Sequence, residues 1–262
     1  MVVFLSQKIL LKGGMLMSSS CAKKGLNISR REFLHGQSVA FRTSRPYGNR
    51  PKRRYFLIVC EGEKTEPNYF EAIANQLPKD MVRRIVVVGT GRNTIDLIAE
   101  AKKEIAKRER SGAPDFYYVW LVFDRDDFPA EKFNEVINAV ETLNREASPE
   151  QGRPYWNCAW SNEAFELWYI LHFQELFGGA LSRTQYQEML EASIRNSTAE
   201  KDFHYKKNDD GMFSRLRSFT PEAIARSERA LKRQMELHGK NWAEMNPATR
   251  VHELVRLLMS YL

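Results

Sequence analysis

Acidic side chains gather at three places in this chain, each directly after an apolar stretch. The first is the loop CEGEKTE at residues 60–66, the second is DRDD at residues 124–127, and the third is the polar segment SNEAFE at residues 161–166. Carboxylates that pack together repel one another unless a cation neutralises them. Oxygen ligands without His or Cys select a hard ion. If the three segments converge, the sequence therefore predicts a site for Mg²⁺ or Mn²⁺.

Such a site has a definite chemistry, because paired divalent ions position and activate water and stabilise the leaving oxygen when a phosphodiester is hydrolysed. Each acid also has a structural explanation. The Asp124-x-Asp126 pair could be a solvated loop or a helix cap. Glu66 and Glu166 fall in expected first helical turns, where a carboxylate favours the helix dipole. The three segments together indicate a site more strongly than any one of them.

Three basic residues, Lys64, Arg92 and Lys206, are candidate contacts to a nucleic acid. Arg92 lies in the loop GTGRNT at residues 89–94, whose backbone N–H groups could hold a phosphate at the start of a helix. The loop lacks the G-K-[ST] ending of a P-loop, so a plain strand-to-helix turn is the alternative. Lys206 lies in a polar stretch that could equally be a solvated loop.

The elements that must position these residues alternate between strand and helix. We expect strands at 55–60, 85–88, 116–123 and 155–160, and helices at 67–77, 94–110, 129–144 and 163–173. Continuously apolar strands are typical of a parallel sheet that is buried on both faces. The alternation predicts βαβ units, and ligands bind such sheets at the carboxyl ends of the strands. All three acidic segments are expected there.

The chain is expected to have three parts: a flexible basic arm at 1–52, an α/β core at 53–177 and a mainly helical extension at 178–262. Helices are expected at 181–196, 221–238 and 247–261. The first 54 residues hold twelve Lys or Arg and one acid, Glu32, although the whole chain has a net charge of only +7. A basic arm next to an acidic site suits a nucleic-acid partner, and a solubilising or mistranslated leader is the alternative.

Composition excludes several other classes of protein. The three cysteines, Cys21, Cys60 and Cys158, lie far apart and form no zinc-binding spacing. Sparse, odd cysteines fit the reducing cytoplasm. The segment SRREFL at residues 29–34 looks like a twin-arginine export signal, but the residues after it are too polar. No stretch approaches the ~18 apolar residues of a membrane span. We therefore expect a cytoplasmic protein without a membrane segment.

Four segments resemble the motifs of the RloB family. They are LIVCEGEKTEP-x-YF at 57–70, WLVFDRD at 120–126, SN-x-x-FELW-x-x-x-HF at 161–173 and NP-x-T-x-V at 246–251. The likeness runs from about residue 53 to the end of the chain, so only the basic arm lies outside it. One departure is Glu163, where the family motif has proline. It leaves open whether Glu163 or Glu166 faces a metal.

The resemblance implies a Toprim-like fold, the metal-binding α/β module of topoisomerases, primases and several nucleases. By position it makes Glu61, Asp124 and Asp126 the catalytic metal ligands, with Glu66 and Glu166 completing the coordination or orienting water. RloB proteins are similar to a subunit of abortive-infection and restriction-associated systems, usually encoded beside an ABC-like ATPase of the RloA kind. Related Toprim effectors act as nucleases, some of them on transfer RNA.

These inferences favour a Mg²⁺-dependent endonuclease that acts on DNA or RNA, possible substrates including transfer RNA, in anti-phage abortive infection. A topoisomerase needs a catalytic tyrosine domain and a longer chain, and a primase of this type brings zinc-binding cysteines. The alternative is a non-catalytic regulatory or nucleic-acid-binding subunit of an ATPase-containing defence complex. A phosphohydrolase of small substrates ranks lower, because in that class the Asp-x-Asp follows the first strand of the core and here it follows the third.

Overall fold

The computed structural model describes residues 54–77, 82–87, 94–126, 129–179 and 181–262. They belong to one compact unit, residues 51–262. The predicted basic arm, the loop that carries Arg92 and the residue Asp127 lie outside the described residues. The predicted boundary between a core and a helical extension at residue 177 stays a prediction.

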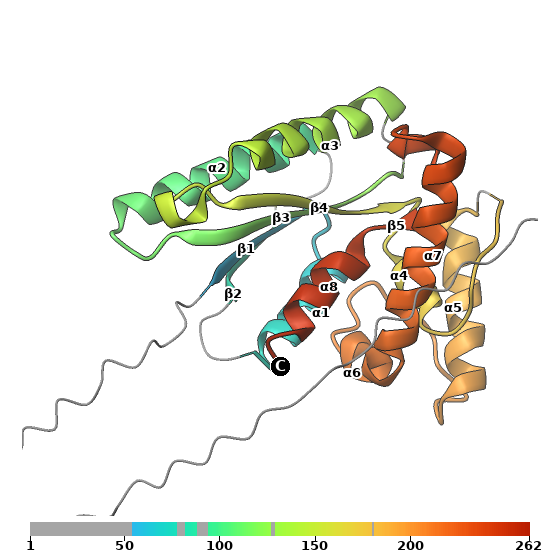
Figure 1. The fold of residues 1–262 in the computed structure, drawn as a ribbon. Helices are drawn as coiled ribbons and strands as arrows, with labels where there is room; N and C mark the ends of the chain where they lie inside the picture. Colours follow the sequence, from blue (N-terminus) through green and yellow to red (C-terminus); the bar gives the residue numbers. More distant parts are fainter. Residues whose placement is uncertain (1–53, 78–81, 88–93, 127–128, 180) are drawn as a thin grey trace, which may run out of the picture. The chain divides into compact units, whose positions relative to one another are not determined.

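A mostly parallel sheet forms the centre of the unit (Figure 1). Within the described residues it has five strands in the order β2-β1-β3-β4-β5. The first four pair in parallel, and β5 pairs antiparallel with β4. The strands are β1 Tyr55–Cys60, β2 Val82–Val87, β3 Phe116–Asp124, β4 Tyr155–Asn162 and β5 Ala248–Thr249. The predicted α/β class with a parallel sheet is confirmed.

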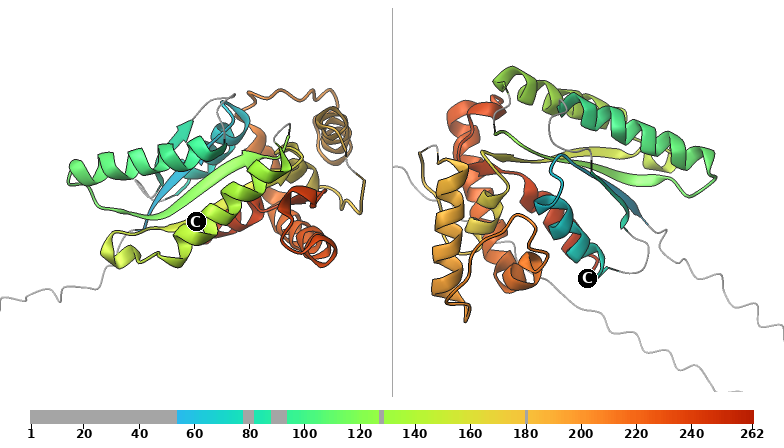
Figure 2. Two further views of the ribbon diagram at one scale, coloured as in Figure 1. Left: turned by 90° about the horizontal axis from the view of Figure 1, so that it is seen from above. Right: turned by 180° about the vertical axis from the view of Figure 1, so that it is seen from behind.

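Helices cover both faces of the sheet, as Figures 1 and 2 show. Along β1, Leu57 and Val59 pack into the layer of α2 and α3, whereas Phe56 and Ile58 pack into the layer of α1 and α8. This alternation explains why the strand is apolar throughout, since neither of its faces contacts water. The four helices are α1 Thr65–Ala74, α2 Thr94–Arg110, α3 Ala130–Arg145 and α8 Val251–Met259.

The helices between β4 and α8 pack against each other and against α1, beside the β4–β5 edge of the sheet (Figure 2). A capping box between Ser182 and Gln185 starts α5, and Pro221 lies in the first turn of α7. The helices are α4 Glu166–Leu171, α5 Arg183–Ser197, α6 Met212–Leu216 and α7 Thr220–His238. Three single turns of 3₁₀-helix lie at Pro149–Gln151, Arg217–Phe219 and Trp242–Glu244.

Two elements next to the site differ from the sequence prediction. The residues expected to start a helix at 247 instead form β5, because Ala248 and Thr249 pair with the last residues of β4. The Thr249 hydroxyl lies 3.1 Å from the Ser161 hydroxyl and 3.1 Å from the carbonyl oxygen of Trp160. This strand fixes the end of β4, so the helix expected from residue 163 begins only at Glu166.

Candidate functional site

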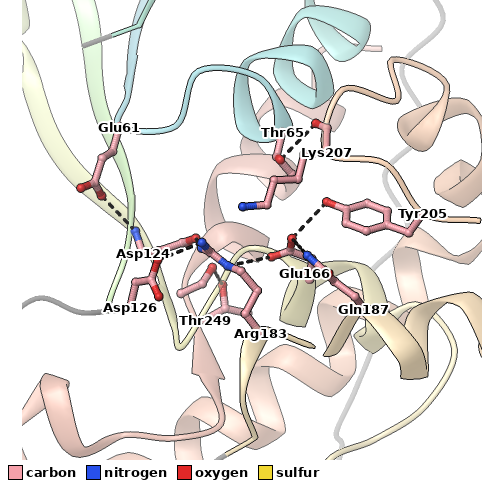
Figure 3. Close-up of polar contacts among 11 residues, drawn as sticks. Glu61, Thr65, Asp124, Asp126, Glu166, Arg183, Gln187, Tyr205, Lys207 and Thr249 are labelled. Atoms are coloured by element: carbon pink, nitrogen blue, oxygen red, sulfur yellow. Dashed lines mark hydrogen bonds and ion pairs between the residues drawn. The ribbon is translucent and has the colours of Figure 1, made fainter. Parts of the chain in front are cut away.

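The first acidic loop is tied to the end of β3. The backbone N–H of Glu61 donates to the carbonyl of Val122 at 2.9 Å. Its carboxylate accepts a hydrogen bond from the backbone N–H of Asp124, with 3.4 Å between Oε2 and N. Burial raises the pKa of Glu61 to about 7, against the opposing effect of that hydrogen bond. The predicted convergence of the loops after β1 and β3 is therefore present (Figure 3).

Asp124 is the last residue of β3, and its side chain is buried. One carboxylate oxygen, Oδ2, accepts a hydrogen bond of 2.7 Å from Nη2 of Arg183. The other, Oδ1, is buried without a hydrogen-bond partner. Burial and the nearby acid Glu66 raise the pKa of Asp124 well above its ordinary value. These surroundings disfavour an unneutralised negative charge on the carboxylate, so a cation beside it is stabilising.

Asp126 follows in a turn with a positive φ of 29°. Its backbone N–H donates to the carbonyl of Glu163 at 3.0 Å, and that of Arg125 donates to the carbonyl of Ser161 at 2.8 Å. These two bonds attach the loop after β3 to the end of β4. They place Oδ2 of Asp126 at 2.8 Å from Nη1 of Arg183, next to Asp124.

Glu66 lies in the first turn of α1 and is only 5% exposed. Burial, together with the negative charge of Glu166, raises its pKa to about 7. Gly62 makes room for this side chain, because a Cβ built on it would lie 2.1 Å from Oε2 of Glu66. The glycine in the first motif therefore lets a buried carboxylate lie against the loop that carries Glu61.

Glu166 is the first residue of α4 and is 2% exposed. Its Oε1 accepts hydrogen bonds from the Tyr205 hydroxyl at 3.2 Å and from Gln187 Nε2 at 3.3 Å. Its Oε2 lies 3.8 Å from Nε of Arg183. Glu166 therefore lies against Arg183, while the backbone carbonyl of Glu163 holds the Asp126 loop. Which of the two acids faces a metal stays a prediction.

Arg183 joins these acids, and the sequence analysis missed it. The guanidinium contacts Asp124, Asp126 and Glu166 (Figure 3). The Ser182–Gln185 capping box places this arginine at the first residue of α5, where the helix dipole disfavours a cation. No sequence signal indicates its contacts, which depend on how α5 packs against the acids. Lys207 is a second missed cation, whose charge acts on Glu66.

The family described as RloB-like protein matches residues 56–258 of the chain. The chain belongs to the RloB-like family. The suspected resemblance is confirmed, and the matched region of this RloB-like protein holds all three acidic segments as well as Arg183 and β5. Neither the curated proteins nor the solved structures contain a match. Of the helices in the described ranges, none combines the length and the apolar character that crossing a membrane requires.

The donor types in this RloB-like site fit a hard divalent ion, because the converging groups are all carboxylates and Asp124 Oδ1 is buried without a partner. The side-chain positions do not yet form a coordination sphere. Across the described ranges, no three His, Cys, Asp or Glu residues are placed to hold a metal ion. The predicted ligands Asp124 and Asp126 pair with the guanidinium of Arg183 instead, and Glu61 accepts a hydrogen bond from the backbone N–H of Asp124. An ion there has to take over the contacts that Arg183 makes.

Two of the candidate nucleic-acid contacts lie in segments that also carry residues of the site, Lys64 between Glu61 and Glu66 and Lys206 between Tyr205 and Lys207. Lys64, just before α1, and Lys206 are both exposed. A hydrogen bond of 3.1 Å from Thr65 Oγ1 to the carbonyl of Lys207 joins their two segments, and the Lys207 amino group extends toward the acids (Figure 3). Arg92 lies outside the described residues. Binding of a nucleic acid by any of these residues stays a prediction.

Gly62→Ala is expected to displace the Glu66 side chain, because the added methyl group overlaps its carboxylate. In a nuclease assay we expect the cleavage rate to fall at least about tenfold, because a misplacement of about 1 Å in a catalytic site can lower a rate by about a hundredfold. Gly178→Ala is the matched control, since a Cβ there meets nothing within 4 Å. Equal activity of the two variants under the same assay would contradict a role for the position of Glu66.

Proposed function

We propose that this RloB-like protein is a Mg²⁺- or Mn²⁺-dependent endonuclease with a Toprim-like core that hydrolyses phosphodiester bonds in DNA or RNA, including transfer RNA. The observation that supports it is the convergence of three carboxylates on one cation position at the carboxyl edge of a parallel sheet, two from the end of β3 and one from the start of α4. That edge is where open α/β sheets bind ligands. The acids supply only oxygen donors, which suits magnesium.

Glu61, Asp124 and Asp126 would hold the metal. When bound, it supplies an electrophile that stabilises charge on the phosphate and lowers the pKa of water. Glu66, whose pKa burial raises to about 7, would act as the base that takes a proton from the attacking water at neutral pH. Glu166, fixed by Tyr205 and Gln187, orients the neighbouring groups.

The exposed lysines in the segments of the site provide the positive charge that a nucleic-acid backbone needs. Lys64 and Lys206 would contact phosphates on either side of the scissile bond, with Arg92 as a further contact. We propose a role in anti-phage abortive infection, as the resemblance to RloB proteins implies, in the cytoplasm and together with an ABC-like or AAA-type ATPase of the RloA kind.

The test is cleavage of supercoiled DNA, ribosomal RNA and transfer RNA by the purified full-length protein, with Mg²⁺, with Mn²⁺ and with EDTA. We expect cleavage of at least one substrate that either metal supports and EDTA abolishes. Cleavage that persists in EDTA would exclude the metal-dependent mechanism. Absence of cleavage under every condition, also with the partner ATPase and nucleotide added, would exclude the nuclease.

A second candidate function is a non-catalytic, nucleic-acid-binding or regulatory subunit of the ATPase complex. One observation favours it: Arg183 already pairs with Asp124 and Asp126, so the acids are partly neutralised without a metal. In that case the protein binds the nucleic acid or the ATPase but cleaves nothing. Toxicity of the protein expressed alone, lost in an Asp124→Ala variant, would decide for the nuclease.

A further inference from the structure

We propose that Arg183 is an internal counter-cation that holds the metal position in the metal-free protein and competes with the divalent ion for Asp124 and Asp126. This inference rests on the metal site of the proposed function and adds a device that controls it. Binding of the ion then requires the guanidinium to leave, which links the occupancy of the site to the position of the first turn of α5.

The contacts of Arg183 are those that an ion would need. Its two terminal nitrogens bind different carboxylates, Nη2 to Asp124 Oδ2 at 2.7 Å and Nη1 to Asp126 Oδ2 at 2.8 Å. Short, charged hydrogen bonds of this type are the strong ones. The guanidinium therefore bridges the two aspartates of the Asp-x-Asp motif, as a shared metal ion would bridge them.

Sharing the site is unfavourable for electrostatic reasons. A magnesium ion lies roughly 2.0–2.1 Å from its oxygen ligands, so an ion on the same Oδ2 atoms would come close to the two guanidinium nitrogens. Arginine stays protonated at any pH a protein survives, so Arg183 cannot give up its charge as a lysine could. The like charges repel, and one cation must move away.

Little besides the acids holds Arg183 in place. It is the first residue of α5, where the helix dipole repels a positive charge. Its Nε is buried without a hydrogen-bond partner and faces Glu166 Oε2 only at 3.8 Å. The side chain is nevertheless 28% exposed, so a path to solvent exists. Neutralising the aspartates with a metal removes the contacts that keep the guanidinium inward.

Arg183 lies at the edge of the acidic site with the Lys207 amino group on the same side (Figure 3). A released guanidinium would stay close to this position, because it remains attached to the first turn of α5. Its planar set of donors matches the oxygens of a phosphate group. After metal binding, the released guanidinium would therefore bind a phosphodiester. The metal ion binds first and the phosphate second.

The test is calorimetric titration of Mn²⁺ into full-length, metal-stripped protein at constant pH and salt. Arg183→Gln is expected to bind Mn²⁺ at least about tenfold more tightly than the wild type, because an ionic competitor is removed. Lys207→Gln is the matched control. It removes one nearby positive charge without freeing an aspartate oxygen, so we expect a tightening of less than about threefold.

Arg183→Lys keeps the charge but cannot bridge both carboxylates, and it is expected to bind Mn²⁺ with intermediate affinity. This variant decides the question if Arg183→Gln does not fold without metal. Equal or weaker binding by the Arg183 variants, or an equal gain in Lys207→Gln, would overturn the competition. The nuclease would survive that result if wild-type protein still cleaves with Mg²⁺, whereas no Mn²⁺ binding by any variant overturns both ideas.

Discussion

Asp124→Asn is expected to lower the rate of Mg²⁺-dependent cleavage by at least about a thousandfold. A bound metal contributes several kcal/mol of transition-state stabilisation, and each 1.4 kcal/mol corresponds to about tenfold in rate. Asp124 is buried, with one oxygen on Arg183 and the other without a partner. Asparagine has the same shape but carries no charge, so it weakens the metal site without leaving a cavity.

Asp115→Asn makes a suitable control for this variant. The two substitutions are chemically identical but lie at opposite ends of β3, since Asp115 precedes the strand and Asp124 ends it. Asp115 is also exposed. We expect wild-type kcat/KM in the control and an unchanged circular dichroism spectrum in both variants. Full activity of Asp124→Asn would remove the acidic site from the mechanism, whatever the substrate.

Much of this fold could be predicted because its central strands carry a strong local signal. β1 and β3 are apolar on both faces, and each ends in a polar loop. The strand β5 could not be found in the same way. It has two residues, Ala248 and Thr249, and only their pairing with the end of β4 makes them a strand. That pairing joins residues 88 positions apart, as the contact between Ser161 and Thr249 shows.

The residues of the site also differ in how far the sequence could predict them. Glu61, Asp124 and Asp126 were predictable, because parallel strands bring their carboxyl ends to one edge of the sheet. Arg183 was not, since its contact with Asp124 joins residues 59 positions apart and depends on how α5 packs. The cluster of acids in the sequence predicts that a positive charge neutralises them. In the structure Arg183 neutralises part of this negative charge, and the metal ion that would neutralise the remainder is a proposal.

The buried acid Glu66 also makes the stability of the fold depend on pH. Glu66 ionises in the unfolded chain near its ordinary pKa of 4.5, but burial raises the pKa in the folded protein to about 7. Between these values the folded state holds a proton that the unfolded state has lost. Stability contributed by this group is therefore complete below about pH 4.5, falls as the pH rises to 7, and stays low above that pH.

Glu66→Gln is consequently expected to stabilise the metal-free protein at pH 8 by on the order of 2 kcal/mol, because an amide cannot ionise and each pKa unit corresponds to about 1.4 kcal/mol. Urea unfolding of both proteins in EDTA measures this difference in the free energy of unfolding. The gain should shrink toward pH 4.5, where both side chains are neutral. Glu71→Gln, an exposed position on the same helix, should change stability by less than about 0.5 kcal/mol.

Two outcomes of this experiment would contradict the electrostatic explanation. A loss of stability in Glu66→Gln at pH 8 would mean that the carboxylate is satisfied by its surroundings, and a gain independent of pH would point to packing. Mg²⁺ adds a further comparison, since an ion at the acids should stabilise the wild type and reduce the advantage of the glutamine. A glutamate retained at a position where it destabilises the folded chain is then explained by the chemistry that its raised pKa allows.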